Sequence, residues 1–539
     1  MARTHLIKML QRAFRVALHA SKKNNASVDE LIGQRNEANY TRRKFIGDVA
    51  KGTALFAAGG LLLPSCKPDA DYGTMNSEDD DANANSKQMQ KIVIVGGGIG
   101  GLNCAYQLKK KNIVSTVYEG SNRTGGRMFT AHNIMAQGLT TELGGEFVDS
   151  GHADIIQLAG EFGLNLLDTQ TSINNGLINE AYFFNNQHYS EADVINALTP
   201  IAQFIQTDID SLPNSITYDN PGNAAALDNT PLDQYIQNLN CNAWLKELLL
   251  VAYVTEYGLE AAEQSTINFL FLFSADTSNG FDIFGESDER YKIAGGNQQI
   301  TNALAQRLGT AVKKERKLIC LDKNNSGKYL LTFEKPNGST VTTDADFVVL
   351  AIPFTLLREV DIKFQLPVWK RNAIDNLGYG TNAKLFLGVN QRVWNTNGYR
   401  GYALSDESFQ IGWDNSELQS GTSGGYTIYF GGNAGANSGV GSVQSQINMH
   451  LPGLNKVFPG IALHQNGNTD RFHWPTHPWT KGSYACYKPG QWTTIAGAER
   501  KHVGNLLFAG EHCSLDFQGY MNGGAETGRK AAKKIIDLM

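Results

Sequence analysis

Three glycines and one glutamate near residue 100 have the types and the spacing of a dinucleotide-binding site. Gly96, Gly98 and Gly101 follow the apolar run 92–95 and fit the pattern G-x-G-x-x-G. The first glycine permits a tight turn, the second lets the backbone approach a pyrophosphate, and the third lets a helix pack on a strand. Glu119 lies 23 positions after Gly96 (119 − 96), where a carboxylate can accept hydrogen bonds from a ribose hydroxyl. These residues predict a dinucleotide site with its phosphates at a helix N-terminus.

A second glycine pair favours FAD over NAD. Gly125 and Gly126 stand between Arg123 and Arg127, just beyond Glu119. Two arginines beside a glycine pair suit a cofactor whose pyrophosphate needs further donors. The segment resembles the signature of flavoproteins that bind FAD, above all the flavin-containing amine oxidases. The resemblance implies that Arg123, Gly126 and Arg127 belong to the cofactor site.

From residue 90 to the C-terminus, the chain resembles the monoamine and polyamine oxidases and their bacterial relatives. The segment 141–149, Thr-Glu-Leu-Gly-Gly-Glu-Phe-Val-Asp, is similar to a family loop that passes near the flavin ring. This resemblance implies that Gly144, Gly145 and Glu146 contact the cofactor. Leu318 matches a strand that lends backbone atoms to the adenine in the family.

The C-terminal segment carries the most specific resemblance. Residues 505–511, Asn-Leu-Leu-Phe-Ala-Gly-Glu, are followed by Gly519-Tyr520-Met521. In the family the acidic residue, here Glu511, contacts the ribityl chain. Tyr520 and Met521 then begin a helix whose N-terminus faces the flavin pyrimidine, and that dipole would stabilise negative charge on the reduced flavin.

Three residues are implied to act on the substrate or on oxygen. Tyr484 and Tyr520 match the two aromatic residues that flank the amine in monoamine oxidases, where two ring faces form a slot that also attracts a cation. The alternative is that each tyrosine is a core residue or a structural hydrogen-bond donor. Lys384 matches the lysine that holds a water molecule near flavin N5, and its alternative is a surface lysine that starts a strand. Ser483 stands where some relatives have the cysteine bonded to flavin, so we predict non-covalent FAD.

Three positions depart from the family pattern. Ser121 stands where relatives often have a basic residue near the cofactor phosphates. Neutralisation of the phosphate charge would therefore depend on helix termini and on Arg123 and Arg127. Glu146 and Phe147 stand where many L-amino-acid oxidases have an arginine for the substrate carboxylate, which argues against an α-amino acid unless another arginine substitutes. Asp149 matches an acidic position of some polyamine oxidases and could bind a distal ammonium; the alternative is a helix-capping aspartate.

Strand-like runs predict the strands that must position these residues. They occur at 91–95, 115–118, 318–321, 329–333, 347–351 and 506–510, with a helix at 300–308. Residues 190–275 have helical periodicity, and residues 381–475 are richer in strand and turn residues. We therefore predict an α/β protein, and the resemblance implies the amine oxidase fold. It has a discontinuous Rossmann-like FAD-binding domain and an inserted mixed α+β substrate domain.

The predicted boundaries divide the chain into alternating pieces. The FAD domain takes residues 91–165, 286–370 and 476–539, and the substrate domain takes residues 166–285 and 371–475. Residues 1–66 are an export signal and residues 67–90 a disordered acidic linker.

The composition excludes several classes of protein. The 539 residues allow more than one domain, and the 10% aromatic content argues against disorder. A net charge of −5 offers no basic surface for nucleic acid. The six cysteines form no C-x-x-C pair, so neither a disulfide framework nor a zinc site is expected, and we predict no metal.

The N-terminus has the pattern of an export signal. Arg42-Arg43 precedes a short apolar stretch, 52–63, which looks like a twin-arginine (Tat) signal and is too short for an ordinary transmembrane helix. Residues 63–66, Leu-Pro-Ser-Cys, resemble a lipobox with Cys66 as the lipidated residue. We expect a bacterial protein that is periplasmic or anchored to a membrane through Cys66.

The combined prediction is an exported FAD-dependent amine oxidase that takes a small-molecule amine and O2. The closest competing interpretation is an L-amino-acid oxidase on the same fold. The sequence is also compatible with a carotenoid desaturase or protoporphyrinogen oxidase of the same superfamily, and with a flavin-holding binding protein without turnover. A plain NAD dehydrogenase is disfavoured by the C-terminal segment.

Overall fold

The computed structural model describes residues 90–172, 176–273 and 289–539. The predicted export signal, the lipobox at Cys66 and all but the last residue of the linker 67–90 lie outside the described residues. Within the described ranges, no helix combines the length and the apolarity needed to cross a membrane.

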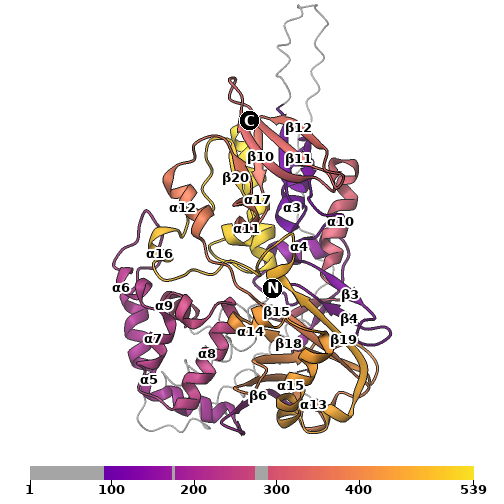
Figure 1. Ribbon diagram of the computed structural model, residues 1–539, viewed down its shortest axis with the longest axis vertical. Helices are drawn as coiled ribbons and strands as arrows, with labels where there is room; N and C mark the ends of the chain where they lie inside the picture. The colour runs from indigo at the N-terminus through magenta and orange to yellow at the C-terminus, as the bar shows by residue number, and fades with distance from the viewer. Residues whose placement is uncertain (1–89, 173–175, 274–288) are drawn as a thin grey trace, which may run out of the picture.

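The upper half of the molecule in Figure 1 is built on a five-stranded parallel sheet. The strand order is β20 (Leu506–Phe508), β13 (Phe347–Leu350), β1 (Ile92–Val95), β2 (Ser115–Tyr118) and β9 (Val312–Lys313). The strands β1 (Ile-Val-Ile-Val) and β13 (Phe-Val-Val-Leu) consist entirely of apolar residues because both faces of the sheet are covered.

The residues of β1 alternate between two hydrophobic cores. Ile92 and Ile94 pack with the helices α3 (Ile99–Lys109), α10 (Gln298–Leu308) and α17 (Met521–Leu538). Val93 and Val95 pack on the opposite face. That face is covered by the four-stranded sheet of β10 (Lys317–Lys323), β11 (Tyr329–Glu334), β12 (Thr340–Ala345) and β14 (Asp361–Ile362). The result is a three-layer domain of the kind that binds dinucleotides at the carboxyl ends of its strands.

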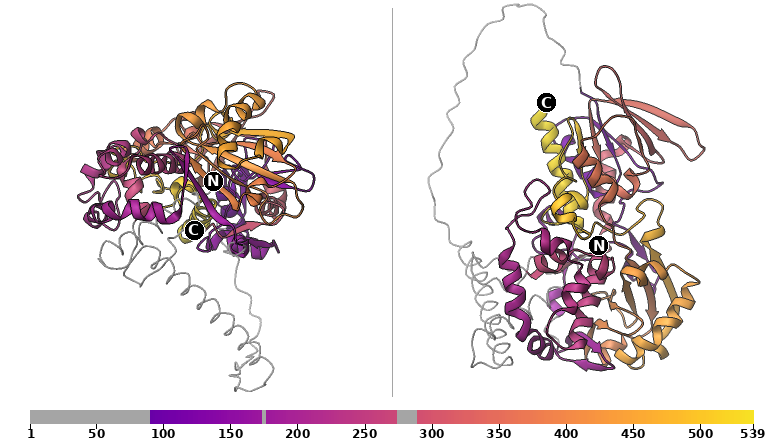
Figure 2. Two further views of the ribbon diagram at one scale, coloured as in Figure 1. Left: turned by 90° about the horizontal axis from the view of Figure 1, so that it is seen from below. Right: turned by 60° about the vertical axis from the view of Figure 1, so that its left-hand side comes forward.

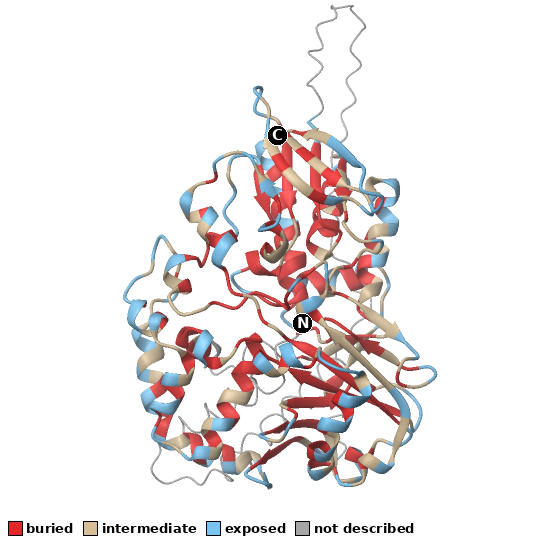
Figure 3. Ribbon diagram, viewed as in Figure 1, coloured by how far each residue is buried: buried red, intermediate tan, exposed pale blue. Residues whose placement is uncertain are grey.

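The lower half contains a seven-stranded mixed sheet with helices on both faces (Figures 1 and 2). Its order is β19 (Gln465–His473), β15 (Ala383–Val389), β18 (Gly424–Phe430), β17 (Ile411–Asp414), β16 (Tyr399–Ser405), β6 (Ile178–Phe184) and β7 (Gln187–Tyr189). One face packs on the helices α5 (Glu191–Ser211), α7 (Leu232–Gln237), α8 (Ala243–Tyr257) and α9 (Thr266–Phe273). The other packs on α15 (Val443–Val457). Strands of both large sheets are buried, as Figure 3 shows.

The observed elements confirm the predicted strands and the α/β class. The strand β2 has the predicted bounds, and β10, β11 and α10 contain the predicted runs. The prediction for residues 381–475 missed the 15-residue helix α15, which has Pro452 in its interior. Its N-cap residue is Ser442, whose side chain accepts a hydrogen bond from the Ser445 N–H. The pairing of β6 with β16, from segments more than 200 residues apart, also had no local signal.

Candidate active site

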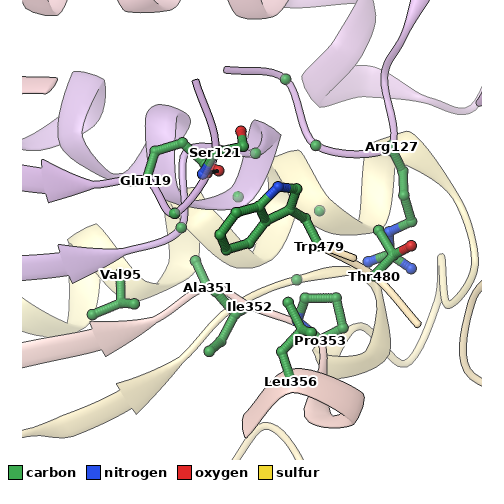
Figure 4. Close-up of a pocket in the computed structure, with 18 of the residues that line it drawn as sticks. Val95, Glu119, Ser121, Arg127, Ala351, Ile352, Pro353, Leu356, Trp479 and Thr480 are labelled. Atoms are coloured by element: carbon green, nitrogen blue, oxygen red, sulfur yellow. Dashed lines mark hydrogen bonds between the residues drawn. The ribbon is translucent and has the colours of Figure 1, made fainter. Parts of the chain in front are cut away.

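A large cleft lies at the carboxyl ends of the parallel strands. Its open space, including the mouth, is about 1260 Å³, and it is lined by the residues that follow β1, β2, β13 and β20 (Figure 4). It brings together most of the predicted cofactor residues. Those that line it are Gly96, Gly98, Glu119, Arg123, Gly126, Arg127, Leu318, Glu511, Tyr520 and Met521.

The glutamate at the end of β2 is held in place by the glycine turn. The Oε2 atom of Glu119 accepts a hydrogen bond from the Gly97 N–H at 2.7 Å, and Oε1 accepts one from the Ser121 N–H at 2.7 Å. A carboxylate oxygen has more than one lone pair, so each can accept a further donor. Ser121, the departure from the family, therefore contributes its backbone N–H.

Each of the three glycines in the turn is needed for a different structural reason. Gly96 has a φ of +109°, which favours glycine. A Cβ on Gly101 would overlap the carbonyl oxygen of Gly96, so this glycine allows the helix α3 to approach the strand β1. A Cβ on Gly98 would meet no atom nearer than Gly126 Cα, at 4.0 Å. The space beside Gly98 is therefore open, as a backbone that cradles a phosphate requires.

Two helix N-termini converge on the cleft. The first turn of α3 contributes Ile99 and Gly100, and the start of α17 contributes Met521 and Gly524. Neither helix has an acidic residue in its first turn, so the partial positive charge of both termini is uncompensated. This arrangement favours an anionic ligand.

An ion pair closes the far end of the cleft. Arg127 Nη1 donates to Glu511 Oε1 at 2.7 Å and to the Ser483 carbonyl at 2.8 Å. Burial opposes ionisation of Glu511, but the charge and hydrogen bond of Arg127, together with His512 and the Gly519 N–H, outweigh it and hold the pKa of this carboxyl below its usual range. The Gly519 N–H also donates to Glu511 Oε2 at 2.9 Å. Arg127 and Glu511 therefore join three segments distant in sequence.

Arg123 is directed toward the backbone. Its guanidinium donates to the carbonyls of Thr124 and Gly126 and lies 3.8 Å above the ring of Phe129. It thereby fixes the second glycine turn that lines the cleft.

Trp479 is a cleft residue that no sequence motif singled out. Figure 4 shows its indole projecting between the segment at Glu119–Ser121 and the segment at Ala351–Pro353. A Cβ at Gly120 would overlap this indole, so the glycine after Glu119 makes room for it. The only sequence signals were an aromatic residue five positions before Tyr484 and a glycine directly after the carboxylate residue Glu119.

We expect Trp479→Ala to weaken the retention of FAD by up to about tenfold, because an aromatic face contributes about 0.5–1.5 kcal/mol beyond its burial. Titration of the apoprotein with FAD, followed by flavin fluorescence, measures the change. Trp479→Phe keeps a ring and should retain most of the affinity. Tighter binding by the alanine variant would contradict this role and show that the indole obstructs the cofactor.

Lys384 is buried next to the glycine pair 144–145. Its side chain is 3% exposed on β15, which excludes the alternative of a surface lysine. Its Nζ donates to the carbonyls of Glu142 and Gly144, both at 3.0 Å, and to Glu146 Oε2 at 3.1 Å. A Cβ on Gly144 would overlap the carbonyl oxygen of Arg127, a residue of the cleft. Lys384, Gly144, Gly145 and Glu146 do not line the cleft themselves but lie directly behind Arg127.

The two predicted aromatic residues lie on adjoining segments. Tyr520 lines the cleft as the N-cap residue of α17, and its ring meets the ring of His152 edge-on at 4.9 Å. The Tyr484 hydroxyl lies 3.2 Å from that of Tyr429 and donates to the Glu256 carbonyl. A Cβ at Gly519 would lie 3.5 Å from the Tyr484 ring, so both tyrosines border the turn at Gly519.

Asp149 is buried and has partners in the protein. Its Oδ1 accepts a hydrogen bond from the Glu289 N–H at 2.7 Å, and its Oδ2 lies 3.3 Å from His152 Nε2. It does not cap the helix α4 (Ala153–Glu161), whose N-cap residue is His152. A distal ammonium would have to share this carboxylate with both groups.

The residues of the cleft fit FAD. The open cradle at Gly98, the carboxylate of Glu119 and the two helix N-termini match the needs of a ribose and a pyrophosphate. Among residues 90–172, 176–273 and 289–539, no three His, Cys, Asp or Glu side chains cluster as metal ligands.

Comparison with known proteins agrees with this geometry. A family model described as flavin containing amine oxidoreductase matches residues 99–536. The L-amino acid dehydrogenase of Synechocystis sp. is 23% identical over 83% of this chain and 95% of that protein. Amine oxidase B of Homo sapiens is 24% identical over 83% of this chain and 86% of that protein.

Solved structures show the same fold. Cyclohexylamine oxidase from Brevibacterium oxydans is 22% identical, with a TM-score of 0.72 over 83% of this chain and 99% of that one. A putrescine oxidase bound to putrescine is 19% identical, with a TM-score of 0.70 over the same shares. The chain therefore belongs to the flavin-containing amine oxidoreductases, and FAD is the cofactor that its cleft holds.

Proposed function

We propose that the protein is an amine oxidase that uses O2 as its electron acceptor. The net reaction converts R-CH2-NH2, O2 and H2O into R-CHO, NH3 and H2O2. FAD supplies the two-electron oxidation of the amine C–H bond, which gives an imine that water hydrolyses. The observation that carries the proposal is the buried ammonium of Lys384, which donates a hydrogen bond to the Gly144 carbonyl behind Arg127, a residue that lines the FAD cleft.

The residues at this end have separate roles in the proposal. The rings of Tyr484 and Tyr520 border the place where the amine would lie and orient it in its neutral form. Burial raises the pKa of the Tyr484 hydroxyl well above its usual value, so this group stays protonated and does not act as a base. Lys384 provides positive charge for electron transfer to oxygen. FAD is proposed to be held without a covalent bond, because Ser483 offers no thiol.

An L-amino-acid oxidase or dehydrogenase is the second candidate. The similarity to a protein named L-amino acid dehydrogenase favours it. The position after the glycine pair carries Glu146, so an arginine elsewhere would have to bind the substrate carboxylate. Arg400 lines a smaller cavity of about 430 Å³ together with Phe147 and Trp413. Its guanidinium pairs with Glu417, with which an amino acid would compete.

We expect at least one monoamine, diamine or polyamine to bleach the flavin of the holoprotein without oxygen and to yield peroxide in air. An absorbance assay at the flavin band, run beside a peroxide assay, measures both. Tyr520→Phe and Tyr484→Phe keep the rings and should retain turnover within about tenfold, whereas Tyr520→Ala should lose most of it, because the ring face orients the amine. Flavin bleaching by amino acids alone would favour the second candidate, and bleaching by neither would contradict both.

A further inference from the structure

A buried cluster of charges lies behind the FAD cleft and includes Lys384. Its centre is Glu146, which is 1% exposed. Glu146 Oε1 accepts a hydrogen bond from Lys292 Nζ at 3.0 Å, and Oε2 accepts one from Lys384 Nζ at 3.1 Å. The indole N–H of Trp413 donates to Oε2 as well, at 3.1 Å. One carboxylate therefore lies between two ammonium groups and has a third donor.

The lysine donors in this cluster are directed by the surrounding backbone. Lys384 has three N–H donors, and Glu142 O, Gly144 O and Glu146 Oε2 accept all three. Lys292 gives a second hydrogen bond to the Asn415 carbonyl at 3.0 Å. The orientation of the Lys384 ammonium is thus determined by one carboxylate and by the loop that carries the glycine pair.

One loop and three strands supply the members of the cluster. Glu146 follows β4 (Thr140–Glu142), Lys292 lies on β8 (Tyr291–Ile293), Lys384 on β15 and Trp413 on β17. Glu146 therefore connects the glycine pair to the seven-stranded sheet. Removal of its charge would leave the two buried cations without a shared anion, which is costly in the interior of a protein.

Neighbouring groups also act on these charges. Burial alone would raise the pKa of Glu146, but Lys292 and Lys384 outweigh it and hold that pKa below its usual range. Burial would lower the pKa of Lys292, but Glu146, with Glu417 and Asp414, outweighs it and raises that pKa. Burial raises the pKa of the adjacent Glu142 to about 7. Its carboxylate accepts hydrogen bonds from the Asn297 N–H and the Thr130 hydroxyl.

We propose that Glu146 is a positioning residue, which holds Lys384 as an oriented cation behind the glycine pair and so sets the electrostatic field at the flavin end of the cleft. Lys292 is the second cation of the cluster. The two lysines and Glu146 together carry a net charge of +1. The inference adds Glu146 to the residues of the proposed function. It depends on that proposed function for the role of Lys384.

The midpoint potential of the bound FAD, measured at one fixed pH, tests the inference without an amine. A cation near the flavin favours its reduced, negatively charged form, so the potential falls when that cation is lost or moves away. Glu146→Gln removes the counter-charge but keeps an acceptor. We expect the midpoint potential of this variant to lie below that of the wild type, because the Lys384 ammonium loses the carboxylate that orients it.

Two further variants separate charge from packing. Glu146→Gln with Lys292→Met restores the net charge of +1, should fold if the single variant does not, and should recover part of the lost potential. Lys292→Met alone leaves Glu146 to Lys384 and should lower the potential less than Glu146→Gln does. Identical potentials for the wild type and for Glu146→Gln, or for the wild type and the double variant, would overturn the inference, as would a loss of thermal stability with no change of the potential.

The result is independent of the amine assay. Because the flavin is reduced with dithionite, a shift in Glu146→Gln supports the inference even if no amine is a substrate. Peroxide formation from an amine, with no shift in Glu146→Gln, would instead retain the proposed function and reject the role of Glu146.

Discussion

Gly101→Ala is expected to lower the free energy of unfolding by about 2–3 kcal/mol and to abolish the retention of FAD. The added Cβ would overlap the carbonyl oxygen of Gly96 and lie 3.2 Å from a methyl carbon of Ile94. Backbone cannot rotate away as a flexible side chain can, so α3 would have to move off β1. Denaturant unfolding of the apoprotein measures the first effect, and flavin absorbance after gel filtration measures the second.

Gly98→Ala is the matched control for this variant. Its Cβ would have only Gly126 Cα nearby, at 4.0 Å, and its φ of −77° suits alanine. We expect the apoprotein to lose less than about 1 kcal/mol, the usual scale of a changed N-cap residue. FAD retention should nevertheless fall, because the methyl group projects into the phosphate cradle. Full retention of FAD by Gly98→Ala would contradict the assignment of this turn to the pyrophosphate.

Lys384→Met is expected to slow the reoxidation of the reduced flavin by O2 on the order of 100-fold, the effect of removing one electrostatic group from a buried site. Glu146 keeps Lys292 and Trp413 as partners, so the variant should fold. Stopped-flow mixing of reduced holoprotein with oxygenated buffer, recorded at the flavin band, gives the rate.

Lys292→Met removes the other cation of the same carboxylate and serves as the comparison. We expect its reoxidation rate to change by much less, because Lys384 remains bonded to the Gly144 carbonyl. Equal rates for the wild type and Lys384→Met would refute the role of Lys384. Equal slowing in both lysine variants would mean that the net charge of the cluster matters and the position of Lys384 does not.

Most of the FAD-binding half could be predicted from the sequence because its sequence signals are local. The apolar run 92–95 and the strand-like run 115–118 form parallel strands, and the turn between Val95 and Ile99 lies at their carboxyl ends as the glycine spacing requires. Parallel strands covered on both faces need continuous apolar residues. A phosphate cradle needs glycine at fixed positions, so both features are visible within a short window of sequence.

The site behind the cleft could be predicted from the sequence only in part. The resemblance identified Lys384 and Tyr484, but their partners come from remote segments: Lys384 meets Glu146 across 238 positions, and Tyr484 meets Tyr429 across 55. No sequence motif predicted that Trp479 lines the cleft. The side chain of a lysine has the same local pattern whether it is exposed or buried, so only its tertiary neighbours show which state it has.

The sequence by itself therefore determined the cofactor class, the strands that hold it and the identity of the residues near it, because short-range backbone geometry restricts which residues are possible there. Only the tertiary structure decided the charge environment of those residues. The ion pair of Arg127 with Glu511 and the enclosure of Glu146 by Lys292 and Lys384 depend on contacts between segments more than 100 residues apart. Electrostatic energies in a buried site depend on distances of a few ångströms, which the order of residues along a chain does not specify.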